Sequence, residues 1–224
     1  MQEIRGRDAA LAVLTDPRFA VPPVPPAQSG VAWLRATVGR FSDGPAHERR
    51  RALSVAILDA IPPEVLRTGG PTDPVRALAR AMGVEQDVVE LVREVAQAYQ
   101  PGTGDEARAD AAVEALVAAF GGHDEPTAAR IGVLVQAYAA TSALIERARH
   151  RPVAEVLRAD PPVPATRRRA LETTTVGGLT IEAGETVSVR LADELAFGAG
   201  PRRCPGSAHA LALVAASRSE GAAA

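Results

Sequence analysis

Proline and glycine breaks divide the first 160 residues into short helical segments, and this punctuation constrains the chain to a mainly helical fold. Between breaks such as Asp16-Pro17, Pro62-Pro63 and Pro101-Gly102, apolar residues recur every three or four positions, as in amphipathic helices. The composition agrees, because 46% of residues are hydrophobic and only 3% are aromatic, and alanine-rich segments favour helix. The predicted helices span residues 7–14, 47–61, 73–82, 85–99, 105–120, about 126–150, and 152–159.

The pattern changes after residue 160. Residues 173–189 alternate β-branched with other residues and contain two glycine turns, which predicts a small β-hairpin. The fold class is therefore mainly α with a small β-hairpin or sheet. We expect one compact domain over residues 1–224, with a loosely packed N-terminal segment over residues 1–30.

Charge and cysteine content restrict partners and location. The formal net charge is −2 and the arginines are scattered, so there is no nucleic-acid footprint. One cysteine excludes an internal disulfide, and charges interrupt the N-terminal apolar residues, so we expect a cytoplasmic protein. The longest uncharged run, residues 131–145, is short for a membrane span and is predicted to be a buried helix.

The stretch "FGAGPRRCPG", residues 197–206, contains that single cysteine. Pro205 suits the first position of a following helix, whose N-terminus would favour a Cys204 thiolate. The glycines allow backbone N–H groups to approach the sulfur, and Phe197 can shield it from water. These residues predict a thiolate metal ligand. The alternative is a buried or incidental cysteine in a glycine-rich turn.

This stretch resembles the haem-binding loop of the cytochrome P-450 (CYP) superfamily, bacterial type. The resemblance implies a reduced cytochrome P-450-like fold with haem b as cofactor, in which residues 195–219 form the cysteine loop and the following helix. It makes Cys204 the proximal iron ligand and Arg202 a partner of a haem propionate. The residues in the family's register are Phe197, Gly198, Gly200, Arg202, Cys204 and Gly206.

Two further segments resemble parts of the same family that hold the haem propionates. "DGPAHERRRAL" supplies His47 and Arg51, which lie one turn apart on one helix face and could clamp an anionic edge. Without the resemblance, such a pair is more often part of a solvated face. Within the triple Arg167-Arg168-Arg169, the family pattern selects Arg168 as a further propionate partner, with an uncertainty of one residue.

A Glu-x-x-Arg signature precedes the "DPPVP" segment. Glu155 and Arg158 match it, and the resemblance implies that they form a structural pair on one helix. The family's meander, which provides a second arginine near this glutamate, is reduced to "RLADE", residues 190–194. We therefore expect an unusually short, truncated member of the family.

The long helix departs from the family pattern on the oxygen-binding side. "AYAATS", residues 137–142, keeps Thr141 as the alcohol associated with oxygen activation but has Ala140 in place of the acid. Tyr138 replaces a glycine and could crowd the iron's open face or supply a hydroxyl, although a core tyrosine is equally compatible. Losing the carboxylate removes part of a proton relay.

Three functions follow from these observations. The first is a haem-thiolate monooxygenase or peroxygenase acting on a small organic molecule, for example a specialised metabolite, with a ferredoxin and reductase or peroxide as co-reactant. The second is non-oxygenase haem chemistry, in which the iron acts without splitting dioxygen, and the altered "AYAATS" stretch favours it. The third is a non-catalytic auxiliary partner of another pathway enzyme. A decayed gene fragment is the remaining alternative.

Overall fold

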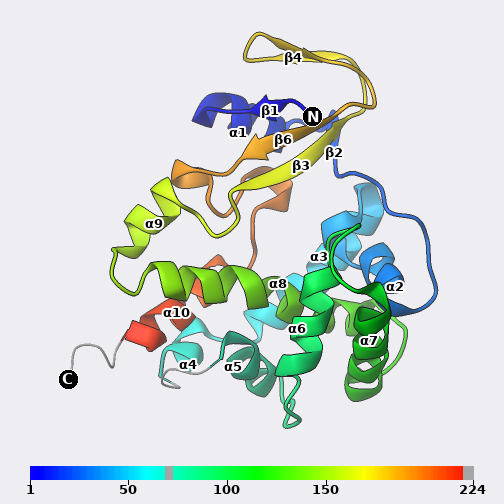
Figure 1. Cartoon of the computed structure of the whole chain (residues 1–224), viewed down its shortest axis with the longest axis vertical. Coiled ribbons are helices and arrows are strands. Elements are labelled where there is room, and N and C mark those ends of the chain that lie inside the picture. The colour runs from blue at the N-terminus through cyan, green and yellow to red at the C-terminus, as the bar shows by residue number, and fades with distance from the viewer. Residues whose placement is uncertain (69–72, 219–224) are drawn as a thin grey trace. The chain divides into compact units, whose positions relative to one another are not determined.

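The computed structural model describes residues 1–68 and 73–218, and the chain forms two compact units (Figure 1). The sheet unit consists of Met1–Pro23 and His150–Cys204, and the helical unit consists of Val24–Arg149 and the chain from Pro205 onward. This differs from the single domain predicted over residues 1–224. The difference arises because the N-terminal residues pair with strands late in the chain, which separates them from the helices that follow.

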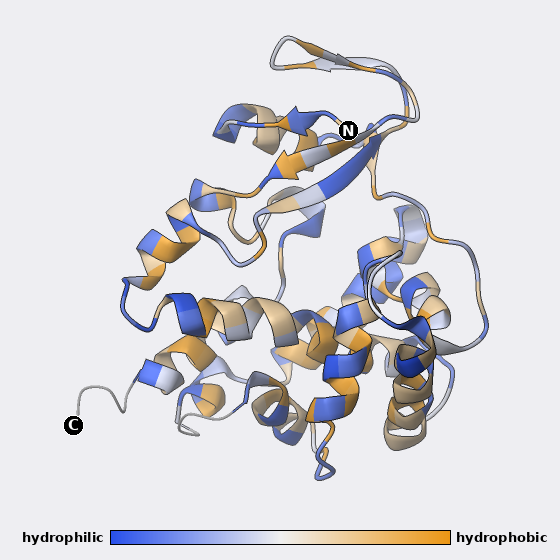
Figure 2. Ribbon diagram, in the orientation of Figure 1, coloured by the Kyte–Doolittle hydropathy of each residue, from blue (hydrophilic) through white to orange (hydrophobic). Residues whose placement is uncertain are grey.

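A four-stranded sheet in the order β1-β6-β3-β2 forms the centre of the sheet unit. β1 runs parallel to β6, whereas β3 is antiparallel to both β6 and β2. In Figure 2, β3 is largely hydrophilic because of its three arginines, and β6 has hydrophobic positions. The strands are β1 (Glu3–Ile4), β2 (Phe19–Ala20), β3 (Ala165–Ala170) and β6 (Thr186–Arg190).

The N-terminal segment contributes to the core of this unit. Ile4 and Val13 are each 1% exposed and Phe19 is 6% exposed, and they pack with Val187 and Val189 of β6. The prediction of loose packing over residues 1–30 is therefore wrong for β1, for α1 (Arg7–Thr15) and for β2. Two-residue strands are too short to produce a visible alternation in the sequence, but they cover the two edges of the sheet.

The predicted hairpin is formed by β4 (Thr174–Val176) and β5 (Leu179–Ile181), which pair antiparallel. Gly177 and Gly178 connect the strands with φ values of 57° and 82°. Positive φ at both central residues is what a tight type I′ turn requires, and glycine adopts it without strain. This prediction is confirmed.

Helices packed around α8 make up the helical unit (Figure 1). Predictions based on proline and glycine breaks are confirmed for α3, α5, α6, α7 and α8, whereas α2 and α4 were not predicted. The helices of this unit are α2 (Gly30–Thr37), α3 (Gly44–Asp59), α4 (Pro63–Thr68), α5 (Pro74–Ala81), α6 (Val89–Ala98), α7 (Glu106–Phe120), α8 (Glu125–Arg147) and α10 (Ser207–Arg218), with the 3₁₀ helix η1 (Gly39–Phe41). Residue 219, the predicted end of the last helix, lies outside the described residues.

α8 is the central helix of this core. Ile131 and Leu134 are fully buried in it, together with apolar residues of α5, α6 and α7. By length and hydropathy alone α8 could span a membrane, but half of its most apolar window is buried inside the protein. Core helices of folded domains share this property, which agrees with the predicted buried helix.

Candidate functional site

The cysteine loop lies in the sheet unit and is closed by backbone hydrogen bonds. It contains two 3₁₀ helices, η2 (Asp193–Leu195) and η3 (Gly200–Arg202). The backbone N–H of Cys204 donates to the carbonyl oxygen of Phe197 at 2.8 Å, and that of Gly198 donates to Leu195 at 2.7 Å. The predicted residues 197–204 are thus brought together in one compact turn.

Gly200 shows why this loop needs glycine. Its φ is +65°, and a Cβ atom at this position would lie 2.8 Å from the carbonyl oxygen of Leu14 at the end of α1. Both the left-handed backbone and the close approach exclude a larger residue. Gly198 also has a positive φ, of 71°. The sequence feature that predicted the loop therefore has a steric cause.

Cys204 is half-buried and forms no disulfide bond. Among the described residues, no group of three or more histidine, cysteine, aspartate or glutamate side chains could hold a metal ion. Cys204 is a single thiol donor, and a haem iron needs no more than one protein thiolate because the porphyrin supplies its other in-plane ligands. In this respect the residues present fit a haem-thiolate centre.

Arg168 is the cation that the strand pattern directs inward. It is 6% exposed, whereas Arg167 is exposed and Arg169 half-buried, because alternate residues of β3 face opposite sides of the sheet. Its Nη1 atom donates to Thr166 Oγ1 at 3.1 Å and to the carbonyl oxygen of Arg167 at 2.8 Å. The structure thus distinguishes Arg168 from its neighbours. Arg202 is half-buried in the cysteine loop.

In the helical unit, His47 and Arg51 lie one turn apart on α3, as the sequence predicts. His47 is 9% exposed and Arg51 is half-buried, so neither lies on a fully solvated face. A buried histidine and a half-buried arginine on one face of a helix are suited to an anionic group.

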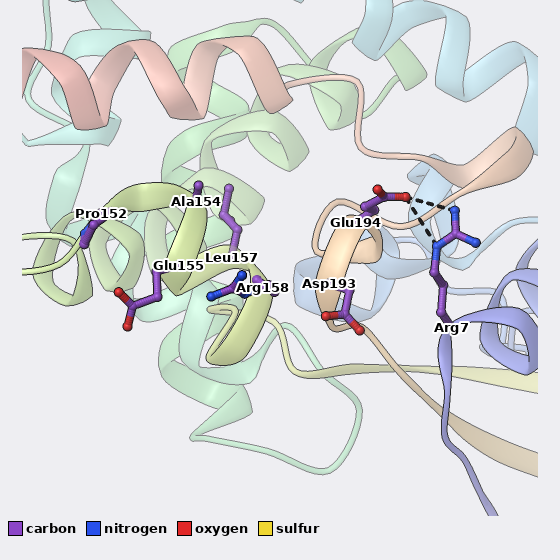
Figure 3. A pocket seen from close by; sticks show the side chains of 8 residues that line it. All are labelled: Arg7, Pro152, Ala154, Glu155, Leu157, Arg158, Asp193 and Glu194. Atoms are coloured by element: carbon purple, nitrogen blue, oxygen red, sulfur yellow. Dashed lines mark hydrogen bonds and ion pairs between the residues drawn. The ribbon is translucent and has the colours of Figure 1, made fainter.

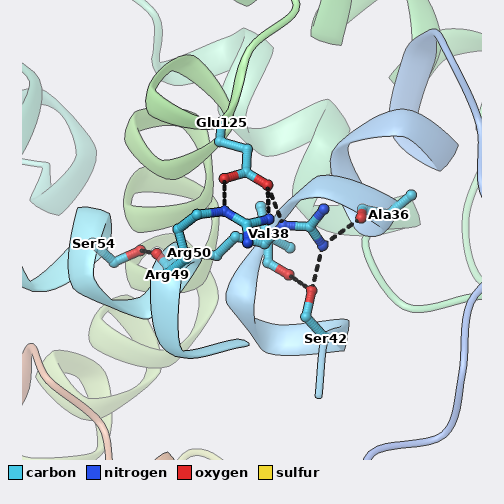
Figure 4. Close-up of polar contacts among 7 residues, drawn as sticks. All are labelled: Ala36, Val38, Ser42, Arg49, Arg50, Ser54 and Glu125. Carbon is cyan, nitrogen blue, oxygen red and sulfur yellow. Dashed lines mark hydrogen bonds and ion pairs between the residues drawn. The ribbon is translucent and has the colours of Figure 1, made fainter. Parts of the chain in front are cut away.

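Arg50, the residue before Arg51, anchors the first half of α3. Nothing in the sequence predicts these contacts. Its Nε atom donates to Glu125 Oε1 at 2.8 Å, and its Nη1 atom donates to the Ala36 carbonyl oxygen at 2.7 Å. Arg49 also donates to Glu125, through Nε, at 2.7 Å (Figure 4). These bonds hold the His47–Arg51 turn to the first residue of α8 and to α2. The hydrogen bonds from Arg49 and Arg50 lower the pKa of Glu125 to about 2.

Thr141 and Tyr138 lie one turn apart on α8. Thr141 is 4% exposed, and Tyr138 is half-buried and packs against the hydrophobic core of the unit. The contact supports a core role for Tyr138, one of the two interpretations of the sequence. Gly206, also in this unit, accepts the first backbone hydrogen bond of α10 from Ala210 at 3.0 Å.

The predicted pair of Glu155 and Arg158 is not formed. Both belong to α9 (Val153–Ala159), but Glu155 accepts hydrogen bonds from Arg151 at 3.1 and 3.2 Å, and Arg158 is exposed. The cause is an arginine just before the helix: Arg151 precedes the N-cap Pro152, and its side chain reaches Glu155 in the first turn of α9.

A cleft of about 690 Å³ separates α9 from η2 within the sheet unit. Figure 3 shows Glu155 and Arg158 on one side, and Asp193 and Glu194 on the other. Glu194 accepts a hydrogen bond from Arg7 Nη2 at 2.9 Å. The η2 side of the cleft thus carries two acids, one of which is paired with Arg7. The lining residues are Arg7, Pro152, Ala154, Glu155, Leu157, Arg158, Asp193 and Glu194.

The fold of the chain matches solved structures of cytochromes P-450. The Mycobacterium smegmatis protein CYP164A2 with econazole bound gives a TM-score of 0.69 at 18% identity, covering 96% of this chain and 82% of that one. P450BioI in complex with an acyl carrier protein ligated to hexadec-9Z-enoic acid gives 0.66 at 19% identity, covering 94% and 82%. A variant of the mixed-function P-450 MycG in complex with mycinamicin V gives 0.61 at 22% identity, covering 93% and 78%. No protein-family model and no curated protein sequence matches the chain.

Proposed function

We propose that this chain, which has the cytochrome P-450 fold, binds haem b through Cys204 and acts as a compact haem-thiolate oxidoreductase on a small organic molecule. The cysteine loop carries this proposal. Its backbone is closed by the Cys204 to Phe197 hydrogen bond, and Gly200 lets it pack against α1. A loop of this kind holds a thiol in one position, which a metal ligand requires.

The haem would supply the redox-active iron. The protein would orient the haem and neutralise the negative charge of its propionates. Cys204 would ligate the iron as a thiolate. Phe197, half-buried in the same loop, would keep water from the sulfur, and Gly198 and Gly206 would leave room for the macrocycle. This role predicts that any larger side chain at Gly200 disrupts the ligand as well as the loop.

The propionates would be held by arginine and histidine side chains. Arg168 and Arg202 are the candidates in the sheet unit, and His47 and Arg51 are those in the helical unit. Buried anionic groups require such partners, because an unpaired carboxylate in a low-dielectric environment is costly. The burial of Arg168 and His47 supports these assignments.

On α8, Thr141 would present its hydroxyl to the substrate side of the haem. In monooxygenase chemistry this hydroxyl would hold a proton near the iron, with electrons supplied by a ferredoxin and its reductase; in peroxygenase chemistry peroxide would replace both. Tyr138, one turn earlier on α8, packs against the hydrophobic core and would support the helix there.

Non-oxygenase chemistry on the haem is the second candidate. It is favoured by Ala140, a residue with no proton to give, next to the buried Thr141. The haem-loaded protein should then convert substrate without reductant or peroxide, whereas the oxygenase requires one of them. The auxiliary role predicts a different result. The protein should then convert substrate in neither condition, and the Cys204→Ala variant should raise the activity of a neighbouring enzyme as much as the wild type does.

Haem titration tests the proposal directly. The wild-type protein should bind one haem per chain, and Cys204→Ala should alter the spectrum of the bound haem. The matched control is Ser207→Ala, which changes a side chain of similar size three residues later. Titration that does not saturate at one haem per chain in folded wild-type protein would refute the proposal.

A further inference from the structure

His209 links two helices of the helical unit through one ring nitrogen. It lies on α10, is 7% exposed, and its Nε2 atom is 3.0 Å from the carbonyl oxygen of Leu58 and 2.8 Å from that of Ile61. Carbonyl oxygens only accept hydrogen bonds, so Nε2 carries the proton and donates to both. The tautomer of the ring is thus set by its partners.

The first acceptor, Leu58, lies in the last turn of α3, and the second, Ile61, lies two residues beyond the end of this helix. Helix ends leave carbonyl groups without partners inside the helix, and a histidine side chain can cap them. Here the cap comes from another helix, 148 residues away from Ile61 in the sequence. The Nδ1 atom of His209 is buried and has no hydrogen-bond partner among the described residues. Only Nε2 therefore contributes bonds, and a side chain that replaces it must reach the same point.

The position of this cap connects the two parts of the sequence that the proposed function uses. α10 begins three residues after Cys204, and α3 carries His47 and Arg51. Arg51 precedes Leu58 by two helical turns, on the same face of α3. A shift of α10 against the end of α3 would therefore move the start of the cysteine helix relative to this basic pair.

We propose that His209 is a positioning residue that sets the spacing between the helix after Cys204 and the helix carrying His47 and Arg51. This inference rests on the proposed haem function. His209 takes no part in the chemistry in this proposal: its ring donates to two backbone carbonyl oxygens and acts through the segments that it joins. Loss of the cap would loosen thiolate ligation and haem retention beyond any loss of stability.

The test compares His209→Leu, which removes the donor, with His209→Gln, whose amide nitrogen reaches the place of Nε2. The readouts are the rate of haem loss to an excess of a haem-binding acceptor and the fraction of the ferrous carbon monoxide complex in the thiolate band. His209→Leu should lose haem about 10-fold faster, within the range expected when a residue supporting a metal ligand is removed. His209→Gln should return the rate to within about 3-fold of wild type.

A stability control separates positioning from packing. Val92→Ala in α6 removes methyl groups from a fully buried position far along the same core. It should lower the thermal stability of the haem-free protein without changing the thiolate fraction. If His209→Leu and Val92→Ala, compared at matched loss of stability, lose haem at equal rates, the inference is wrong.

A second pair of variants keeps the test valid if His209→Leu does not fold. His209→Asn places its amide nitrogen nearer the backbone, at the level of Nδ1, and cannot reach the carbonyls of Leu58 and Ile61. It should lose haem faster than His209→Gln, and equal rates would overturn the inference. Absence of the thiolate band in the wild-type protein would instead refute the proposed function, and this inference with it.

Discussion

The Oε1 atom of Glu125 accepts a hydrogen bond from the Nε atom of Arg50 at 2.8 Å, and this bond joins the first turn of α8 to α3. Hydrogen bonds from Arg49 and Arg50 lower the pKa of Glu125 from an ordinary value of 4.5 to about 2. A carboxylate whose pKa is lower in the folded state stabilises the protein fully above the unfolded-state pKa. Its contribution is lost as the pH falls from about 4.5 to about 2.

Glu125→Gln should therefore lower the free energy of unfolding by about 1.5 to 3 kcal/mol at pH 7, the usual range for hydrogen bonds to a charged group. Urea unfolding at several pH values measures the difference. It should shrink below pH 4.5. Glu146→Gln is the control, because Glu146, in the last turn of α8, makes an exposed ion pair with Arg149 just after the helix. A difference independent of pH would contradict this account.

Gly30 at the start of α2 should not tolerate a side chain. Its φ is +64°, and a Cβ atom would lie 2.2 Å from the Oδ1 atom of Asp110, which accepts a hydrogen bond from the Val31 backbone N–H at 2.8 Å. Gly30→Ala should lower the free energy of unfolding by about 1 to 3 kcal/mol. Thermal unfolding checks this. In the control Gly122→Ala, the added Cβ atom meets no atom within 4 Å. This variant should change the free energy of unfolding by less than about 0.5 kcal/mol.

Replacing Arg168 should weaken haem binding more than replacing its strand neighbour Arg167. Arg168→Gln should weaken haem binding about 10-fold, because a buried cation that partners a carboxylate would be lost. Arg167→Gln, at an exposed position, should leave haem affinity unchanged. Fluorescence quenching of Trp33 on haem addition provides the titration. Equal affinities of the two variants would remove Arg168 from the propionate site.

The Glu-x-x-Arg match should contribute little to stability. Arg158 is exposed, and the pair that Glu155 forms with Arg151 is itself largely exposed. Arg158→Gln and Arg151→Gln should each change the free energy of unfolding by less than about 0.5 kcal/mol, as surface ion pairs do. Chemical unfolding measures both. A loss above 2 kcal/mol in Arg158→Gln would restore the pair predicted from the sequence.

The sequence predicts the helices better than the sheet, because their signals are local. α3 begins near Gly44-Pro45 and α6 ends before Pro101, where the breaks lie in the chain itself. β1 instead depends on pairing with β6, more than 180 residues later, and has only two residues. No local periodicity can report such a contact.

The same limit applies to side-chain partners. The cysteine loop is predictable because its glycines and cysteine lie within ten residues. In the run Glu48-Arg49-Arg50-Arg51, by contrast, nothing local indicates that Arg50 binds the distant Glu125. The partner of Glu155 is hard to predict for a related reason. The helical spacing points to Arg158, whereas the observed partner Arg151 precedes the helix.

The most direct measurement for the central claim is the absorption spectrum of the haem-loaded ferrous protein with carbon monoxide. Thiolate ligation shifts the main band to longer wavelength. The wild-type protein should show the shifted band. Cys204→Ser replaces the sulfur of the single cysteine with oxygen, and this variant should fold but lose the shifted band. An unshifted band in wild type, or a shifted band that survives in Cys204→Ser, would contradict ligation of the haem iron by Cys204.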